Sequence, residues 1–147
     1  MADVDPLALD RQVCFALAAA SRSVIALYRP VLEPLGLTHP QYLVMLALWE
    51  RSPRTARDIS DALLLEPATL SPILKRLEVA GLVTRRRGEY DERTLSLGLT
   101  AAGLTLRDQA ERVPGQIVAR LGMDVTDLEQ IRDSLTELIT ASTRNRP

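Results

Sequence analysis

The sequence predicts a mainly α-helical fold that carries a single β-hairpin. Its 147 residues correspond to one domain, and a content of 46% apolar and 25% charged residues is typical of globular proteins. Apolar residues recur at helical spacing in six stretches, most of them introduced by a capping residue or a proline. Two short stretches alternate instead, and a polar turn at residues 88–92 joins them. The expected order is helix, helix, short helix, helix, hairpin, helix, helix.

The first expected helix runs from Leu7 to Tyr28. Asp5 is its expected N-cap, and Pro6 occupies the first turn, where a missing N–H costs nothing. Pro30 and Pro34 are expected to interrupt the helix. Because it is apolar over so much of its circumference, it needs cover on more than one side, and in a small domain this favours burial in a dimer.

Capping residues define the next three helices. The segment 38–41 is a capping box, in which Thr38 and Gln41 satisfy each other's backbone N–H groups, and its helix ends near Ser52-Pro53. Thr55 caps a short helix. The following helix covers residues 68–80, and Gly81 closes it. The inward positions expected for the short helix are Ala56, Ile59, Leu63 and Leu64.

The C-terminal third begins with the hairpin, whose strands are expected at residues 82–86 and 94–99. Thr100 caps a long helix toward Leu121, and a last helix runs from Val125 to about Ser142. The apolar residues of the last helix form a stripe for a core or a dimer. This arrangement predicts N-terminal helices at 1–53, a DNA-binding region at 54–99 and C-terminal dimerisation helices at 100–147, within one compact domain.

Composition excludes several classes of protein. No apolar run is expected to reach the roughly 18–20 residues of a membrane helix, and the start MADVDPLALD lacks the layout of a signal peptide, so we expect a cytoplasmic protein. The single cysteine excludes a disulfide within the chain. With one histidine as well, zinc sites built from several such ligands are excluded, and no metal or cofactor is expected.

Charge is distributed unevenly along the chain. The net charge is −1, yet residues 72–88 carry five cations against Glu78 alone, which gives +4 there and −5 over the other 130 residues. A basic patch on an acidic body indicates one anionic partner and a separate surface for self-association.

Two short helices followed directly by a hairpin describe a winged helix-turn-helix with a two-stranded wing. Its second helix fits the major groove of DNA, and arginines of the wing suit a narrow minor groove. Asp91 is placed to orient Arg93 through a charge-assisted pair. Taken alone, Thr69 and Ser71 also fit ordinary helix-start chemistry, and the wing also fits a solvated charged turn. The expected DNA-binding residues are Ala68, Thr69, Ser71, Pro72, Lys75, Arg76, Arg85, Arg86, Arg87, Asp91 and Arg93.

One recognition helix binds too weakly for useful specificity, so two copies are expected to read half-sites about one helical turn apart. The apolar first and last helices supply the dimer surface. The sequence therefore predicts a homodimer on a pseudo-palindromic site in double-stranded DNA.

Two motifs carry a family resemblance. The wing RRRGEYDERTLSLGLT followed by LTAAGLTL resembles the MarR family of winged-helix regulators. The N-terminal stretch QVCFALAAASRSVIALYRPVLEPLGLTHPQYLVMLALWE looks like the organic-hydroperoxide-responsive (OhrR-type) repressors. The resemblance covers essentially the whole chain.

The resemblance implies a dimeric repressor that leaves its operator when an organic hydroperoxide oxidises the N-terminal cysteine, here Cys14. It also implies that the hydroxyl of Tyr28 donates toward that cysteine. His39 stands where a second cysteine-contacting tyrosine is common, and Ala18 stands where another tyrosine can occur. With no second cysteine in the chain, the branch that closes an intersubunit disulfide with a distant cysteine is excluded.

The expected helix places Cys14 more than two turns from its N-terminus, too deep for help from the helix dipole. Tyr28 lies roughly 21 Å away on the same helix, so the donors Tyr28 and His39 are expected from the partner subunit. His39 would favour the thiolate if cationic, or donate one hydrogen bond if neutral. An apolar wall that favours alkyl hydroperoxides is expected from Phe15, Leu17 and Met45.

A sulfenic acid in a one-cysteine chain must react onward, to a mixed disulfide with a small thiol, a sulfenamide or an overoxidised acid. The main alternative is a regulator that releases DNA on reversible binding of a small aromatic ligand, with Cys14 structural. A cysteine-dependent enzyme using Cys14 and His39, and a pure interaction module, are further alternatives. We expect no enzyme, because no acidic residue adjoins His39 and no oxyanion loop is visible.

Overall fold

The computed structural model describes residues 4–87 and 94–145, and it has the mainly helical fold with a winged helix that the sequence predicts. The chain divides into two compact units, Met1–Val113 and Pro114–Pro147. Each unit is described by itself below.

The N-terminal helix starts later than expected. Asp5 does cap a turn, since its carboxylate accepts from the Leu7 N–H (3.0 Å), but only a 3₁₀ helix, η1 (Leu9–Arg11), follows. The backbone then becomes extended at Gln12, whose side-chain amide donates to the carbonyl of Pro6 (2.8 Å). Helix α1 therefore covers Val13–Leu32, and a short 3₁₀ helix, η2 (Glu33–Leu35), follows it. Pro30 lies inside α1 and does not end it, contrary to the expectation.

Helix α1 and η2 also contradict the expected absence of a long apolar stretch. By length and composition alone, the segment Val13–Leu35 is sufficient to cross a membrane, with a mean hydropathy of 1.3. One such helix near the N-terminus is weak evidence for a membrane segment, because core helices of soluble proteins meet the same two criteria.

Helices α2 (His39–Glu50), α3 (Ala56–Leu63) and α4 (Pro67–Val79) form the core of the first unit. The predicted caps are confirmed: Thr38 accepts from the Gln41 N–H (3.3 Å), and Thr55 accepts from the Asp58 N–H (3.0 Å). The inward placement of Leu64 is wrong, because this residue adopts a left-handed conformation in the turn after α3 and is 65% exposed. The fully buried residues of these helices include Val44, Met45, Leu48, Ile59, Leu70, Leu74 and Leu77.

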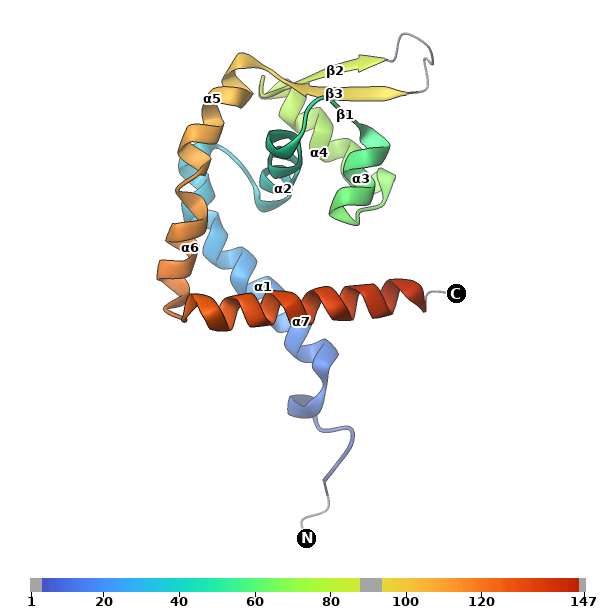
Figure 1. Ribbon diagram of the computed structural model, residues 1–147, viewed down its shortest axis with the longest axis vertical. Coiled ribbons are helices and arrows are strands. Elements are labelled where there is room, and N and C mark those ends of the chain that lie inside the picture. The colour runs from blue at the N-terminus through green and yellow to red at the C-terminus, as the bar shows by residue number, and fades with distance from the viewer. Residues whose placement is uncertain (1–3, 88–93, 146–147) are drawn as a thin grey trace. The chain divides into compact units, whose positions relative to one another are not determined.

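A three-stranded antiparallel sheet lies along one side of these helices (Figure 1). The expected hairpin is present as β2 (Val83–Arg87) and β3 (Leu95–Leu99). The two-residue strand β1 (Arg54–Thr55), which the sequence analysis does not include, pairs with the other edge of β3, so the strand order is β1-β3-β2. Gly81 ends α4 with a φ of 77°, and the Leu82 N–H then donates to the Leu77 carbonyl (3.1 Å), which aims the chain into β2.

Helix α5 (Ala101–Ala110) follows the hairpin and is fixed to it at its first turn. Thr100 caps α5 as predicted by accepting from the Gly103 N–H (3.0 Å), and its hydroxyl donates to the Gly81 carbonyl (2.6 Å). The Trp49 indole N–H donates to the Gly103 carbonyl (2.9 Å) and so ties α2 to α5. Gly103 is buried here, and a Cβ on it would overlap the carbonyl oxygen of Leu82.

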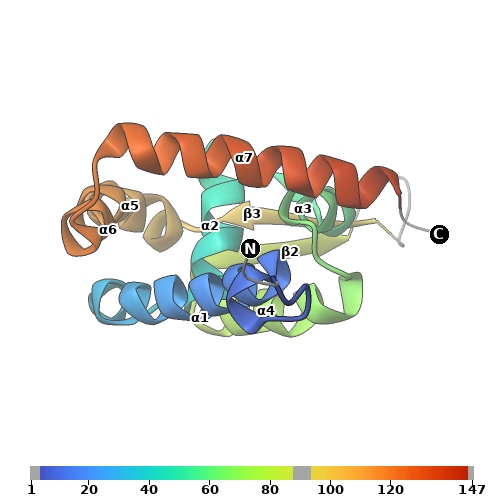
Figure 2. The same ribbon diagram turned by 90° about the horizontal axis from the view of Figure 1, so that it is seen from below.

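The expected long helix toward Leu121 is divided, since α5 ends at Ala110 and α6 covers Val113–Leu121. Pro114 explains the division, because it has no N–H to continue the ladder and disfavours helical backbone at the residue before it. In the second unit, α7 (Val125–Arg144) is a long uninterrupted helix (Figure 2). Asp124 caps α7 by accepting from the Thr126 N–H (3.2 Å).

Candidate functional site

Helix α4 has one buried and one exposed face, as a recognition helix requires. Leu70, Ile73, Leu74 and Leu77 are buried against the first unit. The other face is exposed. The side chains at its N-terminal end are small, which permits a close approach to base edges. Cations follow toward the C-terminal end. All six predicted DNA-binding residues of this helix lie on the exposed face: Ala68, Thr69, Ser71, Pro72, Lys75 and Arg76.

The three consecutive arginines of strand β2 do not share one environment. Arg85 and Arg87 pair with Leu97 and Leu95 of β3, whereas Arg86 pairs with Ser96. Because side chains alternate across a strand, Arg85 and Arg87 lie on the face that Val83 buries, and Arg86 lies on the opposite face.

Arg85 also has an intramolecular partner. Its Nε lies 3.4 Å from the Glu78 carboxylate of α4. Its charge is thus partly engaged within the protein, and its predicted contact with DNA stays a prediction. The remaining two wing residues of that prediction, Asp91 and Arg93, lie outside the described residues.

Sequence reasoning missed a cluster of ionic side chains where α2 meets α3. The Arg54 guanidinium, only 7% exposed, lies 2.8 Å from the Asp58 carboxylate, which also pairs with Arg51 at 2.8 Å. The hydrogen bond from Arg54 holds the pKa of Asp58 below its ordinary value. The spacing of four residues between Arg54 and Asp58 was the available signal, but it does not by itself show that the arginine is buried.

Cys14 is exposed and is the second residue of α1. The expectation that it lies more than two turns into its helix is therefore wrong, because the chain between Asp5 and Gln12 forms a turn and a 3₁₀ helix instead of α-helix. The first turn of a helix carries unpaired N–H groups and the positive end of the macrodipole. Cys14 lies in this turn.

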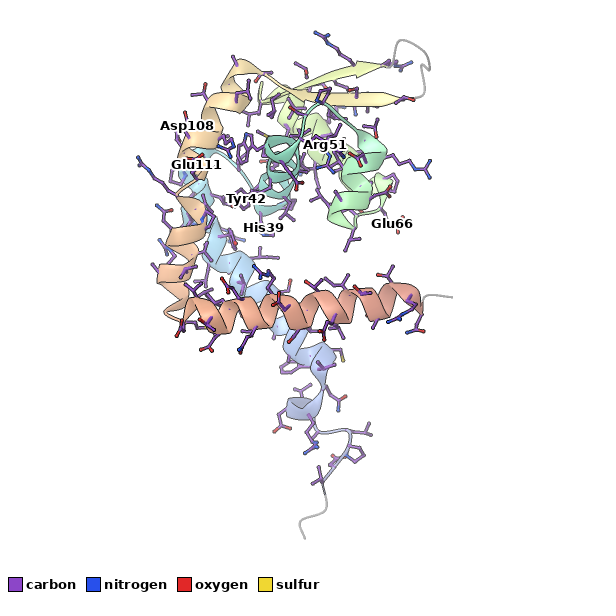
Figure 3. The ribbon with its side chains drawn as sticks, in the orientation of Figure 1. His39, Tyr42, Arg51, Glu66, Asp108 and Glu111 are labelled. Carbon is purple, nitrogen blue, oxygen red and sulfur yellow. The ribbon has the colours of Figure 1, made fainter. Side chains whose placement is uncertain are left out.

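Tyr28 and His39, the two predicted thiolate-supporting residues, are brought together by the packing of α1 against α2. Their ring centroids are 5.0 Å apart in an edge-on arrangement, and Tyr42 adds a third ring 5.8 Å from Tyr28. Figure 3 shows His39 and Tyr42 at the end of α2 away from the sheet, while Arg51 lies toward the sheet. Tyr42 is buried, and Trp49 is partly buried.

Burial sets the protonation states in this ring cluster. It lowers the pKa of His39, which favours the neutral imidazole at neutral pH, and it raises the pKa of Tyr28, which keeps its hydroxyl protonated. Both rings therefore retain a hydrogen to donate. Tyr28, which packs against His39, lies far from the cysteine within one chain, because the 14 residue steps of α1 from Cys14 to Tyr28 span roughly 21 Å.

The predicted apolar wall near the cysteine is only partly available. Phe15 follows Cys14 on α1 and is 41% exposed, and Leu17 is partly exposed. Met45, by contrast, is completely buried in the core of the first unit and offers no surface to a peroxide.

Comparisons with known proteins agree with the fold. The model of the MarR family matches residues 37–95. The organic hydroperoxide resistance transcriptional regulator of Bacillus subtilis (strain 168) is 40% identical over 135 residues, which are 92% of each chain. The structure is similar to that of reduced AbfR of Staphylococcus epidermidis bound to DNA, with a TM-score of 0.79, 36% identity and coverage of 92% of this chain and 93% of that one. Overoxidized AbfR bound to DNA gives a TM-score of 0.69 and 37% identity, over 88% and 94% of the two chains.

Proposed function

This chain belongs to the MarR family of DNA-binding transcriptional regulators, not to an enzyme family, and on that premise we propose that it is a homodimeric repressor that releases its operator when an organic hydroperoxide oxidises Cys14. The observation that carries the proposal is the place of Cys14, exposed in the first turn of an apolar helix. The similarity to a regulator named for organic hydroperoxide resistance supports the same chemistry.

In this proposal residues 54–99 read DNA in the cytoplasm. Helix α4 enters the major groove of a pseudo-palindromic operator with its exposed face. Lys75 and Arg76 reach phosphates, and the wing with Arg85, Arg86, Arg87, Asp91 and Arg93 follows the adjacent minor groove.

Residues 1–53 and 100–147 form the dimer region of the proposed repressor. In support, α1 leaves large apolar side chains in contact with water in the single chain: Val13 is 65% exposed, Phe15 41% and Ile25 40%. Burying such a face is favourable by about 25 cal/mol per Å². A second copy covers this face and brings its own Tyr28 and His39 toward Cys14, which these residues cannot reach within one chain.

The chemical step is a two-electron oxidation. The thiolate of Cys14 attacks one oxygen of the peroxide, an S–O bond forms, the O–O bond breaks, and the alkoxide leaves and takes up a proton as an alcohol. A small cellular thiol then converts the sulfenic acid to a mixed disulfide with loss of water. The neutral His39 and the Tyr28 hydroxyl donate hydrogen bonds to the thiolate without supplying a full charge.

The added group shifts the packing of the first helices and with it the spacing of the two recognition helices. A difference of about 3 kcal/mol between the reduced and oxidised states weakens operator binding by more than a hundredfold.

Substitution of Cys14 by serine tests the sensing step. Operator release by cumene hydroperoxide, measured by fluorescence anisotropy, is expected for the wild type and absent for C14S, while both bind DNA equally when reduced. Intact mass before and after treatment, with and without a small thiol, identifies the modification. Release of C14S by the peroxide contradicts the proposal and favours a reversible small-molecule ligand.

A further inference from the structure

Arg54 is a charged residue at a buried position, where an apolar residue is usual. It belongs to β1 and pairs with Leu97, which is completely buried in β3, and its own side chain is 7% exposed. Taking a guanidinium out of water costs several kcal/mol unless it is paired and hydrogen-bonded. The bonds that Arg54 makes therefore indicate what this charge is for.

Those bonds join three elements of the first unit. The Arg54 Nη1 donates to the carbonyl of Ala47 in the last turn of α2 (3.0 Å), and its Nε donates to Asp58 in the first turn of α3 (2.8 Å). The backbone of the same residue holds β1 against β3, the inner strand of the wing sheet. One residue thus connects α2 and α3 through its side chain and the wing through its backbone.

Asp58 is placed for this contact by the local structure of α3. Its N–H donates to the Thr55 hydroxyl that caps the helix (3.0 Å), and its carboxylate accepts from the exposed Arg51 as well as from Arg54. The two arginines precede α3 in the chain, so the pair fixes how the helix leaves β1. Helix α4 packs on both α3 and α2, and a shift of α3 would be transmitted to it.

We infer that Arg54 and Asp58 are positioning residues for DNA reading: their ion pair sets the orientation of the helix-turn-helix relative to the wing, without touching DNA. The inference rests on DNA binding through α4 and the wing. Contacts to base edges require correct placement of the recognition helix, whereas phosphate contacts tolerate small shifts because they carry no sequence information. Loss of the pair should therefore reduce sequence discrimination more than total charge-driven binding.

The test compares the wild type with the double variant R54M/D58N. Arg54 is buried and Asp58 is partly exposed. Removing one partner alone would leave an unpaired charge, whereas the double change leaves none, so stability and positioning separate in this variant. The Ala47 carbonyl keeps a partner, since it also accepts from the Arg51 N–H (3.2 Å). D61N is the matched control, because Asp61 is an exposed carboxylate on the same helix.

Two duplexes serve as probes, one that the wild-type protein selects from a random library and one of scrambled sequence. For R54M/D58N we expect a loss of about tenfold in affinity for the selected duplex, the size of one well-placed base contact. Affinity for the scrambled duplex should stay within about twofold, the salt slope should be unchanged and the Tm should stay within about 3 °C. D61N should leave the ratio of the two affinities unchanged.

An equal loss of affinity for both duplexes, which leaves the ratio of the two affinities unchanged, would overturn the inference. A salt slope smaller by about 0.9 would also overturn it, because such a change marks a lost phosphate contact. If the double variant does not fold, R54K decides. A lysine keeps the charge but cannot donate to Asp58 and Ala47 as a fork, so about a threefold loss of discrimination is expected and no loss overturns the inference. A wild type that selects no duplex would instead contradict DNA reading itself.

Discussion

Replacing Gly103 by alanine places a methyl group where the start of α5 meets the chain that enters β2. The new Cβ would overlap the carbonyl oxygen of Leu82 and lie 3.2 Å from its carbonyl carbon and 3.3 Å from Leu99 Cδ2. The neighbour is backbone and cannot rotate away. Moreover, the Leu82 carbonyl accepts from the Thr100 N–H (3.1 Å), so moving it also disturbs the cap of α5.

The expected cost has two parts. Overpacking of this kind costs about 1–3 kcal/mol, and weakening the bonds from Thr100 to Leu82 and from Trp49 to Gly103 costs about 1 kcal/mol each. A total of about 3–5 kcal/mol, with a urea m-value of about 2 kcal/mol/M, lowers the urea midpoint by roughly 1.5–2.5 M. Circular dichroism at 222 nm measures this midpoint.

G115A is the control for helix propensity. Gly115 lies in the first turn of α6, and, apart from the neighbouring backbone of its own helix, no heavy atom of the described residues lies within 4 Å of a Cβ placed there. The substitution should raise stability by about 0.5–1 kcal/mol. If G103A loses less than about 1 kcal/mol, the close approach of α5 to Leu82 is not what requires glycine, and the reasoning fails.

Three further substitutions test local features. Leu64 has a left-handed backbone conformation (φ 56°), which is strained for a residue with a Cβ. L64G should therefore stabilise the protein by up to about 1 kcal/mol, and L64V should destabilise it. The reverse order of urea midpoints would contradict the backbone strain at Leu64. Among the described residues the buried Ser60 hydroxyl has no hydrogen-bond partner, so S60A should stabilise by about 1 kcal/mol, and a clear loss of stability would show that the hydroxyl is satisfied. Burial lowers the pKa of His39, so the unfolded chain binds the His39 proton more readily than the folded protein, and stability falls as the pH drops below the unfolded pKa of about 6.5. Between about pH 7.5 and pH 5.5 the urea midpoint should therefore fall less in H39Q than in the wild type. An equal fall in both proteins would refute this.

The predicted DNA-reading helix illustrates what periodicity conveys. The six predicted DNA-binding residues of α4 are exposed, and Leu70, Ile73, Leu74 and Leu77 are buried on the opposite face, because helical geometry fixes which positions share a face. The contacts of the Arg85 side chain could not be predicted from periodicity. Its contact with Glu78 depends on how β2 lies against α4, and only the packed structure supplies that relation.

Cys14 shows the opposite case, in which a local signal misled. Asp5 followed by proline is a sound capping pattern, and it does cap a turn. The α-helix nevertheless begins at Val13, since Gln12 uses its side chain to bind the Pro6 carbonyl and leaves helical geometry. A competing side-chain hydrogen bond of this kind changes the position of the cysteine in its helix, because the residue moves into the first turn.

By itself the sequence determined the helix caps at Thr38, Thr55 and Thr100, the turn at Gly81 and the amphipathic face of α4, since each arises from groups within about five residues of one another. Tertiary structure decided the addition of β1 to the sheet, the burial of Arg54 and the meeting of Tyr28 with His39. These features depend on which elements pack together, and the free energy that selects such packing is shared among residues distant in the chain.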